Sequence, residues 1–266
     1  MNSLSVVIIT YNEEHNIVDC IRSAKLVSDD IIVIDAYSSD QTVSLAASSG
    51  ARTFSTDWKG HGFSRNLGAE KAKNDWILAL DADERITETL AHSIRELNFS
   101  NDNCIYRFHR TNYLGKKKIQ FGTLGFETVK RIYNRNYTRW DLTLVHEKLE
   151  SLHSVKKSIK GSIEHFGLKS EEDYRTKSIL YAQMSAEKYF IQGKKTSLLK
   201  RYGSPLFNSV KSFIFQLGFL NGRIGWISAK TIASYSWLKY FYLQQYWNGA
   251  KIKEIRIAAK PRIERA

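Results

Sequence analysis

Residues 76–83 read WILALDAD, an apolar run that ends in two aspartates two positions apart. The apolar residues predict a buried strand, with Asp81 and Asp83 directly at its carboxyl end. Carboxylates are depleted beside buried strands unless they are paired or bind a metal. Such a pair can hold a hard divalent cation, which in turn binds a diphosphate. The alternative is an acidic turn that caps the following helix.

A second apolar run, residues 4–10 (LSVVIIT), also ends in polar residues, here Tyr11-Asn12-Glu13. In an α/β sheet, ligands bind in the crevice at the carboxyl ends of the strands, so we expect both strand ends to face one crevice. There the tyrosine ring can stack on a base, and the glutamate can accept hydrogen bonds from ribose. Asp35 ends a further apolar run, where it can accept from a base N–H or cap the next helix.

Apolar runs and helical periodicity alternate along the first part of the chain. The predicted strands are residues 4–10, 30–35, 51–54 and 76–80, and the predicted helices are about 13–27, 39–49 and 61–73. Strands that alternate with helices of this length indicate βαβ units. Two later runs, near residues 104–110 and 129–134, extend the sheet. We therefore expect an α/β fold with a mainly parallel sheet flanked by helices.

The positive charge of the chain is concentrated near its end. The whole chain of 266 residues has a net charge of +13. Residues 194–266 contain 14 Lys and Arg against two Glu, whereas residues 1–193 contain 26 basic and 25 acidic residues. We therefore predict a ligand-binding domain over residues 1–193 and a basic helical region over residues 194–266. The basic region indicates a polyanionic partner, either an anionic membrane surface or nucleic acid.

Several classes of protein are disfavoured by patterns that the sequence lacks. Cys20 and Cys104 lie among apolar residues, which favours a reducing compartment over a disulfide framework. The chain enters a strand at once and has no apolar run of about 18 residues, so we expect neither a secretory signal nor a membrane-spanning helix. No G-x-G-x-x-G or P-loop pattern follows the first strand, which disfavours nicotinamide, flavin and P-loop chemistry.

Four segments in order resemble the signatures of family 2 glycosyltransferases of the GT-A fold. They are VVIITYNEEHN (6–16), IIVIDAYSSDQT (31–42), GHGFSRNLGA (60–69) and DWILALDADER (75–85). Four later segments resemble the branch that contains lipopolysaccharide-core β-1,4-glucosyltransferases. These are RIY (131–133), VHE (145–147), IEHFG (163–167) and LGFLNGRIG (217–225). The resemblance covers roughly the whole chain and implies a Rossmann-like GT-A fold.

The resemblance also implies roles for single residues. Thr10, Tyr11, Glu13 and Asp35 would surround the nucleoside of a UDP-sugar, and Arg65 would lie near the base or the diphosphate. Asp81 and Asp83 would hold Mg²⁺ or Mn²⁺, with Asp83 as the direct ligand. His165 would complete the metal or diphosphate shell, or else serve a structural role. Ala36 departs from the family, which often has an acidic or hydroxyl residue there, and this leaves the detail of base recognition open.

An inverting transferase also needs a carboxylate that accepts a proton from the acceptor hydroxyl. Glu127, Asp141 and Glu147 are the candidates outside the aspartate pair. We favour Glu147 because VHE matches the family and follows a predicted strand. Glu127 is the alternative, since Gly125-Phe126-Glu127 also resembles an acceptor-loop motif. Glu147 can instead form a structural salt bridge, to Lys148 or Arg131.

The last quarter of the chain combines helical periodicity with aromatic and basic residues. Apolar residues repeat at helical spacing over 206–220, and Trp and Tyr alternate with Lys over 226–247. Such mixtures settle at the headgroup level of a bilayer. They also occur in core helices and in proteins that bind single-stranded nucleic acid, but no RNA-binding motif is present. We therefore expect no nucleic-acid partner and a cytoplasmic enzyme that lies on the inner face of the cell membrane.

Three hypotheses follow from the sequence. The first is a metal-dependent, inverting hexosyltransferase that moves a sugar, with glucose favoured, from a UDP-sugar to a lipid-linked glycan such as the lipopolysaccharide core of the cell envelope. The second is a sugar-phosphate nucleotidyltransferase, which would need a Gly-rich loop after the first strand. The third is a non-catalytic module that binds membrane or nucleic acid, which gives Asp81 and Asp83 no function.

Overall fold

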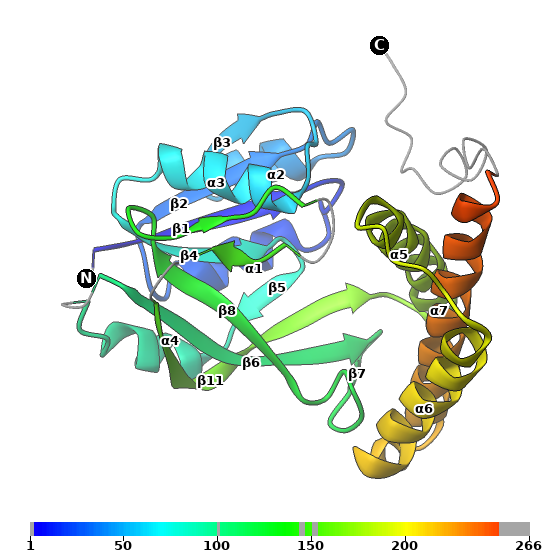
Figure 1. Ribbon diagram of the computed structural model, residues 1–266. Helices are drawn as coiled ribbons and strands as arrows, with labels where there is room; N and C mark the ends of the chain where they lie inside the picture. Colours follow the sequence, from blue (N-terminus) through cyan, green and yellow to red (C-terminus); the bar gives the residue numbers. More distant parts are fainter. Residues whose placement is uncertain (1–2, 100–101, 144–146, 151–153, 250–266) are drawn as a thin grey trace. The chain divides into compact units, whose positions relative to one another are not determined.

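The computed structural model describes residues 3–99, 102–143, 147–150 and 154–249, and it divides into two compact units (Figure 1). The first unit comprises residues up to 118 together with 124–167. The second unit comprises residues 119–123 and the chain from 168 onward. Sheet dominates the first unit and helices dominate the second.

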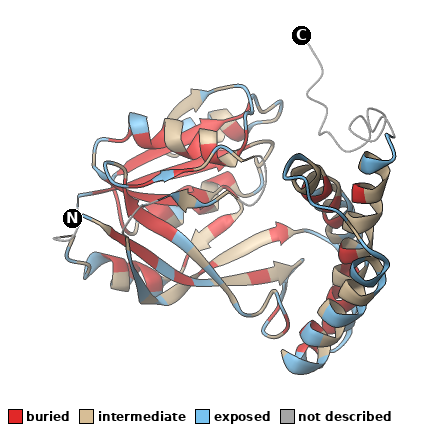
Figure 2. Ribbon diagram, viewed as in Figure 1, coloured by how far each residue is buried: buried red, intermediate tan, exposed pale blue. Residues whose placement is uncertain are grey.

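Half of the main sheet is parallel and forms the centre of the first unit. Its strands are β1 (Leu4–Thr10), β2 (Asp30–Asp35), β3 (Arg52–Ser55) and β4 (Trp76–Asp81), in the spatial order β3-β2-β1-β4. β1 and β2 are buried at every position, as strands covered on both faces must be (Figure 2). The covering helices are α1 (Ile17–Ala24), α2 (Thr42–Ser48) and α3 (His61–Lys71). The parallel pairing of β1 with β2 and β4 brings their carboxyl ends to one edge.

The other half of the sheet is antiparallel and continues from β4. β8 (Glu127–Asn134) pairs with β4, and the order then runs through β6 (Cys104–Leu114) and β11 (Val155–Leu168) to β5 (Glu84–Ile86). The short β7 (Lys117–Lys118) pairs with β6, and β9 (Arg139–Trp140) pairs with β10 (Leu149–Glu150) in a separate sheet. α4 (Glu88–Arg95) follows β5. The pairing of β5 with β11 places His165 opposite Glu84.

The close packing of α3 on the parallel strands depends on a glycine. Gly68 lies in α3, and a Cβ at this position would overlap the side chain of Val7 and approach Ile34 Cγ1 to 3.1 Å. The backbone of α3 can therefore lie directly on β1 and β2 only because position 68 has no side chain. This contact fixes α3 beside the carboxyl ends of the strands.

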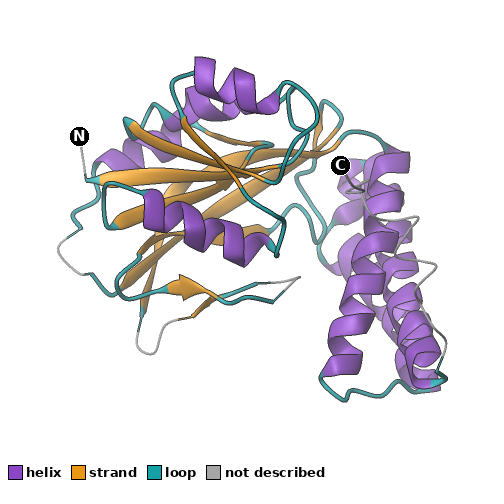
Figure 3. Ribbon diagram, turned by 90° about the horizontal axis from the view of Figure 1, so that it is seen from above, coloured by secondary structure: helices purple, strands orange, loops and turns teal. Residues whose placement is uncertain are grey.

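Two long helices run side by side in the second unit (Figure 3). α5 (Glu171–Ile191) and α7 (Arg223–Trp247) start together, where Glu171 pairs with Arg223, and end together, where Phe190 stacks on Tyr246. Between them the chain forms η1 (Leu199–Gly203), α6 (Ser204–Val210), η2 (Lys211–Phe215) and η3 (Gly218–Asn221). Residues 119–123 join this unit through hydrogen bonds to Asn221 and Ser212.

The predicted α/β class with a helical C-terminal region is confirmed, and each predicted strand is present. The strands that continue the sheet beyond β4 pair in antiparallel orientation. The charge distribution predicted a domain boundary at 193, whereas α5 packs against α7 in the helical unit. Cys20 and Cys104 are buried free thiols. Within the residues described, none of the helices has the length and hydropathy needed to cross a membrane.

Candidate active site

A cavity of about 180 Å³ opens at the carboxyl ends of β1, β2 and β4. Residues from three strand ends and from the start of α3 line it: Ile9, Thr10, Tyr11, Glu13, Ile34, Ala36, Trp58, His61, Ser64, Asp81, Ala82 and Asp83. The two polar strand ends identified in the sequence therefore do face one crevice. Five of the predicted site residues lie in its wall.

Thr10 presents an unsatisfied polar atom at this cavity. The residue is 7% exposed, and its Oγ1 is buried without a hydrogen-bond partner in the described part of the chain. A buried hydroxyl without a partner is costly, and a bound ligand removes that cost by forming the hydrogen bond. Glu13 lies beside it and accepts a hydrogen bond from Asn16 at 2.7 Å. This wall of the cavity is therefore polar and ready for a polar ligand.

Asp35 is hydrogen-bonded to the loop that follows β2. Its side chain is buried and accepts hydrogen bonds from the backbone N–H of Ser38, at 2.8 Å, and from the Ser38 hydroxyl. The residue does not line the cavity, whereas the neighbouring Ala36 does. Ser38 in turn accepts a hydrogen bond from the backbone N–H of Asn12, at 2.8 Å. Asp35 thus fixes the loop after β2 against the loop after β1.

Asp81 is held by two arginines. Its Oδ1 lies 2.6 Å from Arg65 Nη2, and its Oδ2 lies 2.8 Å from Arg131 Nη2. Burial by itself would raise the pKa of Asp81, but Arg131 and Arg65 lower that pKa well below its ordinary value. Arg65 is 3% exposed, lies 4.5 Å above the ring of Trp140 and does not line the cavity. Both Asp81 oxygens therefore have cationic partners.

Asp83 faces His165, which comes from β11. The backbone N–H of Phe166 donates to the Asp83 carbonyl at 2.9 Å, and His165 Nε2 lies 3.5 Å from Asp83 Oδ2. Asn112 fixes the imidazole, because its amide NH₂ donates to Leu124 and to Glu127, so that its Oδ1 accepts from His165 Nδ1 at 2.6 Å. The other ring nitrogen, Nε2, is thus directed at Asp83. Burial lowers the pKa of His165, but Asp83 raises it above the ordinary value overall.

Gly167 lies directly against this pair. A Cβ at position 167 would overlap the His165 ring and lie 2.8 Å from Asp83 Oδ2. Only glycine leaves the space beside the two side chains open. The motif IEHFG in the sequence therefore combines a potential ligand, His165, with the residue that keeps its surroundings clear.

The two candidate bases both form ion pairs. Glu127 accepts from Arg110 Nε at 2.9 Å and from Arg110 Nη2 at 2.5 Å, and it also accepts from Asn112. Glu147 pairs with Arg65, and neither Lys148 nor Arg131 is its partner. For both glutamates burial raises the pKa, but the arginine partner lowers it below the ordinary value overall.

These contacts join into one continuous polar chain. Its members, in order of contact, are Glu147, Arg65, Asp81, Arg131, Glu84, Arg110, Glu127, Asn112, His165 and Asp83. Five carboxylates face three guanidinium groups, so an excess of two negative charges remains when His165 is neutral. A divalent cation would balance this excess.

The residues at Asp83 fit such a cation in part. Asp83 and His165 offer an oxygen and a ring nitrogen to the same point. Within the described residues, no three His, Cys, Asp or Glu side chains converge to hold a metal ion by themselves. A cation here would therefore take its remaining ligands from diphosphate oxygens and water, as Mg²⁺ commonly does. Asp81, with both oxygens bonded to arginines, would act on it through charge.

The family model for glycosyl transferase family 2 matches residues 5–159. The chain belongs to glycosyltransferase family 2. The matched residues include both polar strand ends and both candidate bases, so the family predicted from the sequence motifs is confirmed.

Curated relatives cover most of the chain. The lipopolysaccharide core biosynthesis glycosyltransferase LpsC of Rhizobium meliloti (strain 1021) is 28% identical over 247 residues, which cover 88% of this chain and 89% of the relative. An uncharacterized glycosyltransferase of Rickettsia typhi (strain ATCC VR-144 / Wilmington) is 26% identical over 259 residues, which cover 92% of this chain and 88% of the relative. Among solved structures, S. aureus TarS 1–349 in complex with UDP has a TM-score of 0.43 at 19% identity, covering 92% of this chain and 91% of that chain.

Some residues of the site were missed in the sequence. His61 and Trp58 line the cavity, and burial lowers the pKa of His61 below its ordinary value. His61 stands in the motif GHGF, so a signal was present. Glu84 stands in the motif DWILALDADER, so a signal was present there too. Arg110 and Asn112 had no such signal, because their roles depend on which antiparallel strands lie side by side.

Proposed function

We propose that this family 2 enzyme transfers a sugar, with glucose favoured, from a UDP-sugar to a lipid-linked glycan with inversion at the anomeric carbon. The single observation that supports this most is the cavity at the carboxyl ends of β1, β2 and β4. Its wall contains Thr10, whose buried hydroxyl has no partner among the described residues, and Asp83, which faces His165. Crevices at such strand ends are where α/β sheets bind nucleotides.

The donor would be held by the strand ends. In the proposed pose, Tyr11 stacks on the base and Glu13 accepts hydrogen bonds from ribose hydroxyls, while the hydroxyl of Thr10 donates to the donor sugar nucleotide. Asp35 would contribute indirectly, by fixing the loop that contains Ala36. Arg65 would likewise act on the diphosphate through Asp81, since its guanidinium is bonded to that carboxylate and to Glu147.

Mg²⁺ or Mn²⁺ is the proposed cofactor, held by Asp83 and His165. Bound there, it would supply Lewis-acid stabilisation of the charge that develops on the departing diphosphate. Asn112 would keep His165 in the tautomer that directs Nε2 at Asp83. The excess of negative charge along the polar chain supports this assignment, and Arg65 and Arg131 keep Asp81 ionised beside it.

The base would be one of the two glutamates on the polar chain. The sequence motif favoured Glu147, but accessibility supports Glu127, whose side chain is 30% exposed against 13% for Glu147. An acceptor hydroxyl must come within hydrogen-bond reach of the carboxylate, directly or through one water. Glu127 is also joined through Asn112 to the Asp83–His165 pair. We therefore assign the proton transfer to Glu127 and a positioning role to Glu147, through Arg65.

The acceptor is proposed from the relatives and from charge. LpsC is named for lipopolysaccharide core biosynthesis. The basic C-terminal region suits a substrate embedded in an anionic membrane. Together they support a lipid-linked glycan of the cell envelope as acceptor, and peripheral attachment to the cytoplasmic face of the inner membrane.

Product analysis with a panel of nucleotide sugars tests the proposal. UDP-glucose and other UDP-sugars are incubated with purified lipopolysaccharide core acceptor, with Mg²⁺, Mn²⁺ or EDTA. Release of UDP that needs both acceptor and metal, together with a β-linked product, is the expected result. Release of pyrophosphate from a sugar phosphate and UTP would indicate a nucleotidyltransferase instead. No turnover with any donor would overturn the proposed activity.

A further inference from the structure

Large apolar side chains are exposed along residues 198–220, which we call the apolar segment. Of the 21 exposed large hydrophobic residues in the described part of the chain, ten lie here. They are Leu198, Leu199, Tyr202, Leu206, Phe207, Ile214, Phe215, Leu217, Phe219 and Leu220. Single exposed apolar residues are normal, but such a concentration marks an interaction surface.

Two uncharged polar side chains of the apolar segment face inward, whereas its large apolar side chains face outward. Ser212 is 2% exposed, and its hydroxyl accepts from the backbone N–H of Thr123 at 3.1 Å. Asn208 donates to a hydroxyl on α7 at 3.0 Å. By contrast, Leu206 and Phe207 are 67% and 64% exposed. A helix on the surface of a water-soluble domain has the opposite polarity, whereas a helix in contact with lipid has this one.

Charge around the apolar segment has one sign. Residues 188–253 contain 11 Lys and Arg and no Asp or Glu. Lys194, Lys195, Lys200 and Lys211 are exposed within or beside the segment. Lysine is depleted at protein–protein interfaces, whereas lysine beside apolar and aromatic residues is typical of helices at the surface of an anionic bilayer. The chemistry therefore favours a lipid surface over a protein partner.

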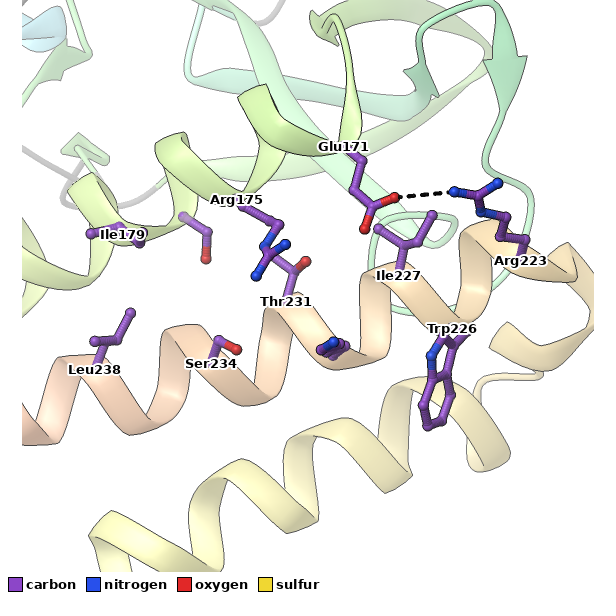
Figure 4. A pocket seen from close by; sticks show the side chains of 11 residues that line it. Glu171, Arg175, Ile179, Arg223, Trp226, Ile227, Thr231, Ser234 and Leu238 are labelled. Carbon is purple, nitrogen blue, oxygen red and sulfur yellow. Dashed lines mark ion pairs between the residues drawn. The ribbon is translucent and has the colours of Figure 1, made fainter.

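A cationic groove between α5 and α7 extends this surface (Figure 4). It encloses about 340 Å³, and Arg175, Arg223 and Lys230 line it, with Glu171 as the one carboxylate among its lining residues. Glu171 lies 3.7 Å from Arg223, which leaves two cations in excess. Trp226 lines the groove, is 61% exposed and makes an edge contact with Phe213 of η2. The groove and the apolar segment thus meet at a residue type that prefers the headgroup level.

We propose that the apolar segment is the membrane-insertion element of this protein. Its leucine and phenylalanine side chains enter the boundary between headgroups and acyl chains of an anionic bilayer, while the lysines and the cationic groove contact lipid phosphates. This inference deepens the proposed membrane association and assigns the contact to 198–220. The sequence predicted that aromatic residues of α7 contact the membrane. Two of them have contacts within the helical unit instead: Trp237 stacks on Phe241 at 5.1 Å, and Trp247 donates to the carbonyl of Lys194 at 2.9 Å.

Vesicle co-sedimentation of the full chain tests the proposal without any sugar nucleotide, so its failure would leave the proposed transferase reaction untouched. The vesicles are phosphatidylcholine alone or an equimolar mixture with phosphatidylglycerol, each at low and high salt. We expect strong binding to the anionic vesicles and a salt-resistant fraction. The double variant L206S/F207S should lower the partition coefficient by about tenfold or more, because it removes two large apolar side chains from the inserted surface.

The matched control is Y137S/L142S, which removes two apolar side chains of similar exposure, 56% and 66%, from the first unit. It should bind like the unmodified chain. K200Q/K211Q should weaken the salt-sensitive part of binding alone. Thermal unfolding checks that each variant is folded. In addition, brominated acyl chains should quench the tryptophan fluorescence of the unmodified chain, and less so in W226F.

Two results would overturn the proposal. The first is equal vesicle binding by the unmodified chain and L206S/F207S, with no quenching by brominated lipid. The second is a dimer by light scattering that L206S/F207S dissociates, without vesicle binding by either form. In that case a second copy of the chain covers the apolar segment.

Discussion

His165 Nε2 lies 3.5 Å from Asp83 Oδ2, although the two residues are far apart in the sequence. His165 belongs to β11, and Asp83 directly precedes β5, the strand that pairs with β11. Asn112 holds the other nitrogen of the ring, so the imidazole cannot turn away without losing a hydrogen bond of 2.6 Å. The geometry is therefore set by β6, by β11 and by the turn between β4 and β5, before any ligand arrives. Pre-organised ligands of this kind need little rearrangement to bind a cation.

Replacing Asp83 with Asn should weaken Mn²⁺ binding by about tenfold or more, because a neutral amide oxygen is a poorer ligand than a carboxylate. Calorimetric titration of Mn²⁺ in the presence of UDP measures this without turnover. Asp141→Asn, a carboxylate outside the polar chain, is the matched control and should bind Mn²⁺ normally. Unchanged Mn²⁺ affinity in Asp83→Asn would remove Asp83 from the metal site.

Gly167→Ala should produce a similar loss by steric means. The added methyl group would overlap the His165 ring and press on Asp83 Oδ2, so the pair must separate. Gly203→Ala is a suitable control, since its Cβ would meet Leu199 Cδ1 at 3.4 Å, an ordinary contact. We expect Mn²⁺ affinity to fall in Gly167→Ala while the thermal midpoints of both variants stay close to that of the unmodified chain. Full metal affinity in Gly167→Ala would show that the open space beside the pair is not needed.

Glu127→Gln and Glu147→Gln should differ in kind. Loss of the general base lowers kcat by roughly 10²-fold or more, with little change in donor affinity, so we expect this result for Glu127→Gln. Glu147→Gln removes a charged partner of Arg65 and should mainly raise the KM for the donor, through Asp81. Steady-state kinetics with varied donor separate the two effects. A collapse of kcat in Glu147→Gln alone would exchange the two roles.

The parallel half of the fold could be predicted because each of its strands carries a local signal. β1 and β4 are continuous apolar runs that end in polar residues, and the strand ends alone place Thr10 and Asp83 in one crevice. The antiparallel half carries less local information. Asn112 and Arg110 acquire their roles from the pairing of β6, β8, β11 and β5, which depends on long-range contacts that no short motif encodes.

The C-terminal region shows the same limit. The charge distribution assigned α5 to the first domain, because this helix contains both acidic and basic residues. In the structure, however, α5 packs against α7. Composition drew attention to the aromatic residues of α7, yet Ser185 hydrogen-bonds to Tyr235 at 2.9 Å and Arg201 lies over Trp237 at 5.2 Å. Many of these rings are therefore used inside the helical unit. Only the structure shows which side chains face outward along residues 198–220.

Thr10→Val should weaken donor binding without loss of stability. The Oγ1 of Thr10 has no partner among the described residues, so its replacement by a methyl group of similar size removes no internal hydrogen bond. A hydrogen bond to the ligand contributes about 1 kcal/mol, which corresponds to roughly fivefold in UDP affinity. Thr128→Val, at an exposed position on β8, is the control. Equal UDP affinity for Thr10→Val and the unmodified chain would exclude a contact at this hydroxyl.

Acid stability should depend on Asp30 at the start of β2. Its carboxylate is 7% exposed and accepts hydrogen bonds from Ser5 Oγ at 2.6 Å, from the Lys73 N–H at 2.8 Å and from Arg52 Nη2 at 2.8 Å. Burial raises the pKa of Asp30, but these donors lower it below the ordinary value overall. A carboxyl whose pKa is lower in the folded state than in the unfolded chain stabilises the fold above the unfolded pKa of about 3.9. That contribution is lost as pH falls through the lower, folded-state pKa.

Asp30→Asn removes this titration while it keeps one acceptor oxygen. We expect the variant to be less stable at pH 7, by about 1–3 kcal/mol, because a neutral side chain leaves part of the donor set unsatisfied. Its stability should then fall less steeply than that of the unmodified chain as the pH is lowered from about 5 to 3. All other carboxylates are present in both proteins, so the difference between the two curves reports on Asp30. Urea unfolding across this range measures both effects. Asp29→Asn, at the exposed neighbouring position, is the matched control, and Asp30→Asn curves parallel to those of the unmodified chain would contradict the role of Asp30.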